Sequence, residues 1–114
     1  MNVLEAFTRA RKLLDDASKT DWPDADLFDW YNDSVVILRK ARPDTQIAAD
    51  GTYITYVAAA STSTAMLFAE PEAWVIALAD YMASRAFGED AGDKRDAARS
   101  AFHWQNFSNY VAML

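Results

Sequence analysis

The chain has 114 residues, a net charge of −6 and 52% hydrophobic residues, which is enough for one domain with a real core. The acidic balance argues against a protein that grips nucleic-acid phosphates through a basic footprint. The absence of cysteine excludes a disulfide framework, a thiolate nucleophile and a cysteine-ligated metal.

The first element is a predicted helix over residues 2–17, whose apolar side chains recur at helical spacing. Asp15 and Asp16 lie near its C-terminal end, where the helix dipole disfavours negative charge, so we expect the helix to fray soon after Leu14. This stretch reads as an amphipathic helix and not as a signal peptide, and no apolar run approaches the roughly 18 residues that span a bilayer. We therefore expect a soluble chain, made in the cytoplasm, with no membrane partner.

A second helix is predicted over residues 22–42. Pro23 suits a first helical turn, and Asp21 is placed to cap it. Basic residues favour the C-terminal end, and Pro43 disfavours helix at Arg42.

The segment 47–69 changes period, because TYITYVAA alternates between two sides and is rich in β-branched and aromatic residues. It predicts a short β-hairpin or an extended arm, which must pack on the helices or join a neighbour's sheet. Two further helices are predicted over residues 71–87 and 92–113, joined by a short polar break that makes them antiparallel neighbours. The expected fold is mainly α, a single four-helix domain over residues 1–114.

The aromatic content, with four Trp, five Tyr and six Phe, exceeds what one small core readily absorbs. Any one of these residues can belong either to an aromatic-rich core or to a partner interface, where aromatics are enriched. The apolar C-terminus also needs a cover, and we expect it to insert into a partner or an adjacent subunit. The interface candidates are Trp22, Trp30, Trp74, Tyr81, Arg85, Phe102, Trp104, Phe107, Tyr110, Val111, Met113 and Leu114.

Seven of the seventeen acids lie between residues 15 and 33, and Asp26, Asp29 and Asp33 share one helix face by their spacing. Such a cluster could bind a divalent cation or perform acid–base chemistry, but charged runs commonly stay in water or meet a subunit. Basic residues of a neighbouring copy are the natural counter-charge, and contacts between different patches give head-to-tail rings. The channel or inter-subunit charge candidates are Asp26, Asp29, Asp33, Arg39, Lys40 and Arg42, and Arg9, Arg11 and Lys12 are further possible counter-charges.

The lone histidine, His103, has no second ligand at helical spacing, so we expect a structural or interface role rather than a metal or catalytic one. The three glycines are too far apart for a phosphate-binding loop, and there is no G-x-S-x-G motif. We expect no cofactor, no metal and no catalytic residue.

Two motifs at the ends of the chain point to a family. The first is W-x-D-x-x-L-x-x-W-x-N followed by R-P-D, and the second is A-L-x-x-Y-x-x-x-R-A-F followed by an acidic turn and a helix with His103 and Phe107. Together they resemble the head–tail connector proteins of tailed bacteriophages, also called adaptor or head-completion proteins. The matching positions are Trp22, Asp24, Leu27, Trp30, Asn32, Arg42, Pro43, Asp44, Ala77, Leu78, Tyr81, Arg85, Ala86, Phe87, Glu89, Asp90, His103 and Phe107.

The resemblance implies a structural virion protein at the head–tail junction. Such proteins form a homo-oligomeric ring of roughly a dozen copies below the portal protein, extend the DNA channel and dock the tail or tail-completion proteins. DNA would pass without sequence-specific binding, because an acidic lumen does not hold phosphates. Two other hypotheses stand beside this one: a small helical protein–protein interaction module of a regulator or antitoxin type, and a small enzyme that uses the aspartate cluster.

Overall fold

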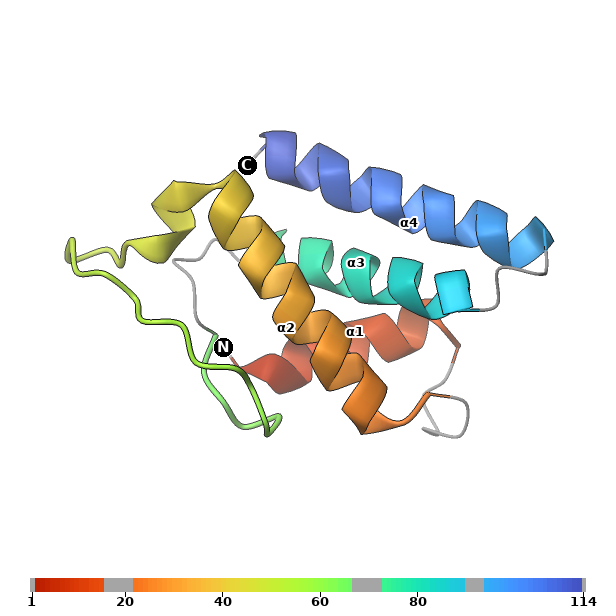
Figure 1. Ribbon diagram of the computed structural model, residues 1–114, viewed down its shortest axis with the longest axis horizontal. Helices are drawn as coiled ribbons and strands as arrows, with labels where there is room; N and C mark the ends of the chain where they lie inside the picture. Colours follow the sequence, from red (N-terminus) through yellow and green to blue (C-terminus); the bar gives the residue numbers. More distant parts are fainter. Residues whose placement is uncertain (1, 16–21, 67–72, 90–93, 114) are drawn as a thin grey trace.

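The computed structural model describes residues 2–15, 22–66, 73–89 and 94–113. Its elements are helix α1 (Val3–Leu13), helix α2 (Asp24–Ala41), the short 3-10 helix η1 (Pro43–Gln46), helix α3 (Ala73–Glu89) and helix α4 (Lys94–Met113). Figure 1 shows the four long helices, with α2 crossing in front of α1 and α3. The predicted mainly helical, four-helix fold is confirmed.

The ends of the first two helices follow local backbone chemistry. Helix α1 stops at Leu13, four residues before the predicted end, and Asp15 adopts a left-handed backbone with φ of 54°. Aspartate tolerates that conformation, and the early end agrees with the expected fraying near Leu14. Pro23 is the extended residue before α2 rather than part of its first turn, and the predicted cap Asp21 lies outside the described residues. Helix α2 ends at Ala41, as the proline at position 43 predicts.

The segment between α2 and α3 is an extended arm, and the alternative of a paired β-hairpin is not confirmed. Within residues 47–66, Ile47 and Tyr53 form one isolated antiparallel bridge around a tight turn, and Gly51 there has a φ of 86°, which glycine adopts without strain. Beyond that turn no strand pairs with residues 54–60. Positions 67–69 of the predicted hairpin lie outside the described residues.

Backbone groups of the arm form hydrogen bonds with a side chain and with helix amides, instead of with a second strand. Both the amide N–H and the carbonyl of Ala59 bond to the side chain of Asn32 on α2, at 2.8 and 3.1 Å. At the start of α1, the N–H groups of Val3 and Leu4 donate to carbonyls of residues 64 and 62, both at 3.0 Å. These first-turn amides have no partner inside the helix, so the arm satisfies them and is held against α1 and α2.

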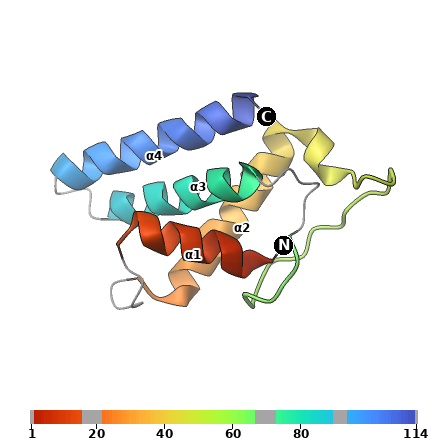
Figure 2. The same ribbon diagram turned by 180° about the vertical axis from the view of Figure 1, so that it is seen from behind.

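Helix α3 is the centre of the fold. Eleven of its seventeen residues are buried, which is the pattern of a helix enclosed on most sides. Figures 1 and 2 show α4 lying along it, with α2 on one side and α1 on the other. Two hydrogen bonds join the last turns of α3 to the first turns of α4. The hydroxyls of Ser84 and Ser100 each donate to the other residue's carbonyl, at 2.9 and 2.8 Å.

Candidate functional site

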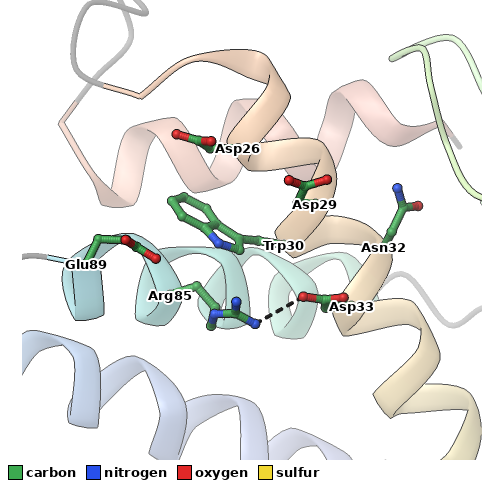
Figure 3. Close-up of a pocket in the computed structure, with 7 residues that line it drawn as sticks. All are labelled: Asp26, Asp29, Trp30, Asn32, Asp33, Arg85 and Glu89. Atoms are coloured by element: carbon green, nitrogen blue, oxygen red, sulfur yellow. Dashed lines mark hydrogen bonds and ion pairs between the residues drawn. The ribbon is translucent and has the colours of Figure 1, made fainter.

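The three acids predicted to share a face of α2 border one open hollow of about 500 Å³ (Figure 3). All three side chains are exposed. The residues that line this acidic hollow are Asp26, Asp29, Trp30, Asn32 and Asp33 of α2, with Arg85 and Glu89 of α3. Four carboxylates against one guanidinium leave the hollow with three net negative charges, so it suits a cationic side chain of a partner.

Arg85 reaches from α3 to the edge of the acidic hollow, where its Nη1 lies 3.1 Å from Oδ2 of Asp33 (Figure 3). The same nitrogen donates to the hydroxyl of Tyr81 at 2.8 Å. Partial burial lowers the pKa of the guanidinium, but the hydrogen bonds and charges of Tyr81 and Asp33 outweigh burial, and the pKa is raised. Arg85 therefore stays charged, and it forms an ion pair with one of the four acids, Asp33.

Two of the predicted charge candidates, Arg39 and Arg42, make contacts within the monomer. Arg39 is 5% exposed, donates to the carbonyl of Ile54 and lies over the rings of Tyr53 and Tyr56. It thus ties the arm to α2 rather than facing a neighbouring subunit.

Arg42, at the end of α2, pairs with Asp44 and donates to the carbonyl of Val111 at 3.0 Å. Its guanidinium also lies over the ring of Trp74. Arg42 therefore joins the ends of α2, α3 and α4. Lys40 is exposed, as a charge candidate should be.

The aromatic candidates divide between core and surface. Trp30, Trp74, Tyr81 and Phe107 are at most 5% exposed, so packing within the monomer accounts for them. Trp22, Tyr110 and Val111 are partly buried against that core. Phe102, Trp104 and Met113 are 61%, 48% and 78% exposed, and all three belong to α4. Leu114 lies outside the described residues.

Among the described residues of the predicted set, the large apolar side chains most exposed to a partner are these three of α4. Trp104 also contacts the rings of Tyr81 and Phe107, so one of its faces supports the fold. Phe102 packs edge-on against His103 and otherwise faces outward. Exposed aromatic side chains of this kind are typical anchors of protein interfaces.

His103 is buried, and its Nδ1 lies 2.7 Å from Oδ1 of Asp80 on α3. Its ring stacks on Phe87 with an interplanar angle of 11°. Asn106 also donates to Asp80, at 3.4 Å. The sequence reasoning named the histidine but missed Asp80, although one acid in an otherwise apolar helical run is a signal of a buried partner.

Groups that would hold a metal are not assembled in the described part of the chain. No three histidine or acidic side chains there are arranged to bind one ion, even though four carboxylates border the acidic hollow. None of the described helices is both long enough and apolar enough to cross a bilayer.

Comparison with protein-family models gives no match. Searches of curated proteins and of solved structures give none either.

Proposed function

We propose that this chain is a head–tail adaptor of a tailed bacteriophage. In this role it is a structural virion protein whose copies form a ring below the portal, extend the DNA channel and provide the docking surface for the tail. The proposal starts from the two motifs that resemble the connector family, and the contacts of those motif residues support it.

The observation that carries the proposal is that the motif residues join the separate elements of the fold. Trp22 and Trp30 pack edge-to-face with ring centroids 5.9 Å apart at the start of α2. Asn32 holds the arm at Ala59, and Arg42 holds the end of α4. A motif that specifies contacts between elements specifies an arrangement of helices, which is what members of one structural family share.

The surface of the molecule supports a role in assembly. Helix α4 presents Phe102, Trp104 and Met113, which suit contact with another protein such as the portal or a tail component. The acidic hollow adds a second kind of contact, because it can receive cations of a neighbouring subunit. Any acids that face the channel would let DNA slide, since phosphates gain no counterion release there.

Disruption of the gene in its phage tests the proposal. We expect DNA-filled heads without tails in electron micrographs of the lysate, and restoration of tailed particles when the intact gene is supplied in trans. Tailed, infectious particles from the disrupted phage would overturn the proposal. If the chain then co-purified with a cellular protein, a helical interaction module without a virion role would be the better description.

A further inference from the structure

A second hollow lies on a different side of the molecule from the acidic one. It is a groove of about 760 Å³ between α1 and the start of α3. The groove is bordered by the apolar side chains of Leu4, Leu13 and Ile76 and by the charged side chains of Glu5, Arg9 and Lys12, which together leave one net positive charge. We call it the basic groove. Helix α1 lies in front of α3 in Figure 2, whereas α2, which carries the acidic hollow, lies in front in Figure 1.

The exposed leucines of the basic groove flank its charged residues along α1. Leu4 and Leu13 are 48% and 37% exposed, so both offer apolar surface at the groove. Arg9 and Lys12 lie between them and are exposed. Within the described residues, neither cation makes an ion pair. With Glu5 included, the groove therefore offers one net positive charge flanked by apolar surface.

The outer face of α2 has the complementary pattern. Asp29, Asp33 and Val36 are spaced i, i+4 and i+7, so they lie along one face, and Val36 is 41% exposed. Asp26 lies one turn before Asp29 on the same face. Neither Asp26 nor Asp29 has a cation partner among the described residues. This face presents negative charge followed by an apolar side chain.

Most other cations of the described chain are already used within the monomer. Arg11 is buried and pairs with Asp24, and Arg85 pairs with Asp33. Arg39 and Arg42 hold the arm and the end of α4. Arg99 pairs with Asp96 at 3.5 Å. Among the described residues, the exposed cations outside these contacts are Arg9 and Lys12 at the basic groove and Lys40 on α2.

We propose that the basic groove of one copy receives the acidic face of α2 from a second copy of this chain. Arg9 and Lys12 then meet Asp26 and Asp29, while Leu4 or Leu13 covers Val36. One subunit cannot satisfy both surfaces internally, because they open on different sides of the molecule. Each copy therefore has two neighbours in a head-to-tail arrangement, and such a contact produces a ring when its rotation closes. The inference rests on the proposed function and identifies its subunit contact.

Charge reversal and mixing test this contact. The base-reversed variant carries Arg9→Glu and Lys12→Glu, and the acid-reversed variant carries Asp26→Lys and Asp29→Lys. An Arg99→Glu variant is the matched control, because Arg99 is an exposed cation of α4 that borders neither the basic groove nor the acidic hollow. Analytical ultracentrifugation of the full chain at low salt measures self-association, and circular dichroism checks that each variant is folded. If the acid-reversed variant does not fold, Asp26→Asn with Asp29→Asn replaces it, and the test is then the weaker association of each variant alone, without the mixture.

The proposal predicts that the wild-type chain self-associates with increasing concentration and that salt weakens the association. Each reversed variant alone associates about tenfold or more weakly, because like charges then face each other. An equimolar mixture of the two associates again, because each groove then finds a face of opposite charge on the other variant. The Arg99→Glu variant behaves as the wild type does.

Three results would overturn the proposal: a wild-type chain that stays monomeric, reversed variants that associate like the wild type, or a mixture that remains monomeric. None of them would decide the adaptor proposal, because tailless heads are scored separately and a ring can use other surfaces.

Discussion

His103 Nδ1 lies 2.7 Å from Asp80 Oδ1 between α4 and α3, with both side chains at most 10% exposed. This buried polar pair lies at the centre of the hairpin formed by α3 and α4, which makes up one side of the core. Around it lie Phe87, stacked on the imidazole, and Asn106, which donates to the same carboxylate oxygen. The pair fixes the register of α4 on α3 more specifically than apolar packing does.

Asp80→Ala should lower the free energy of unfolding by about 2–3 kcal/mol, because it leaves a buried imidazole without its partner. Asp80→Asn is the matched control, since it keeps the volume and an oxygen acceptor, and it should cost about 1 kcal/mol. Urea unfolding followed by circular dichroism measures both variants. An Asp80→Ala chain as stable as the wild type would show that the pair contributes nothing to the fold.

Arg42→Ala should loosen the end of α4, because Arg42 donates to the carbonyl of Val111 and lies over Trp74. We expect a loss of about 1–2 kcal/mol of stability and faster amide hydrogen exchange in the last turn of α4. Asp44→Ala is the control: it removes only the exposed ion pair and should cost about 0–1 kcal/mol. Unchanged exchange in α4 of Arg42→Ala would contradict this role.

Asn32→Ala should release the arm from α2, since the Asn32 side chain bonds both backbone groups of Ala59. Limited proteolysis should then cut residues 54–60 sooner than in the wild type, while the helices stay intact. Asn32→Asp keeps the acceptor for the Ala59 N–H and loses only the donor, so its cleavage rate should lie between the two. Equal cleavage of all three chains would show that other contacts hold the arm.

Stability should fall as the solution becomes strongly alkaline. Burial, and then the charge of Tyr56, raises the pKa of the Tyr31 hydroxyl above its ordinary value of 10.0. A raised folded-state pKa gives stability that is fully present below pH 10 and is lost as the pH rises toward the folded pKa. Thermal unfolding between about pH 8 and pH 11.5 should show this decline beginning near pH 10.

Tyr31→Phe is the control for the alkaline decline, because it keeps the ring and removes the group that titrates. Its midpoint should fall less steeply than that of the wild type over the same range, although the other tyrosines and the lysines still titrate. A wild type and a variant with parallel profiles would show that Tyr31 does not cause the decline.

Phe102→Ser should leave stability within about 1 kcal/mol of the wild type, because the ring is 61% exposed. If α4 docks a virion partner, the same change should reduce the number of tailed particles when the variant complements the disrupted gene. The inward-facing neighbour provides the comparison: Phe107→Ser should unfold the chain by removing a buried ring. Full complementation by Phe102→Ser would exclude this residue from docking.

Helical periodicity and helix-end chemistry predicted the number and order of the helices. Pro43 limited α2 correctly, because its ring restricts the residue before it wherever that residue lies in a fold. The structure of the arm was harder to predict than the helices. The alternation of TYITYVAA is typical of a strand, but it does not indicate which segment will pair with it. In the fold the partners are Asn32 and the first amides of α1, which are distant in sequence.

The acidic surface was predictable because the spacing of Asp26, Asp29 and Asp33 fixes them on one face of any helix. Which basic residues would be used within the monomer was not predictable, because the sequence does not distinguish Arg39 and Arg42 from the exposed Lys40. Tertiary contacts decide between them: Arg39 binds the arm, and Arg42 binds the end of α4. Burial of Trp30 and Trp74, similarly, depends on how α2 and α3 cross.

Electron cryo-microscopy of the purified chain mixed with the portal rings of its phage tests the central claim most directly. The account predicts a closed ring of copies below the portal, coaxial with its channel, in which neighbouring subunits meet through different surfaces. Portal rings without added density, or with single copies bound away from the axis, would contradict it.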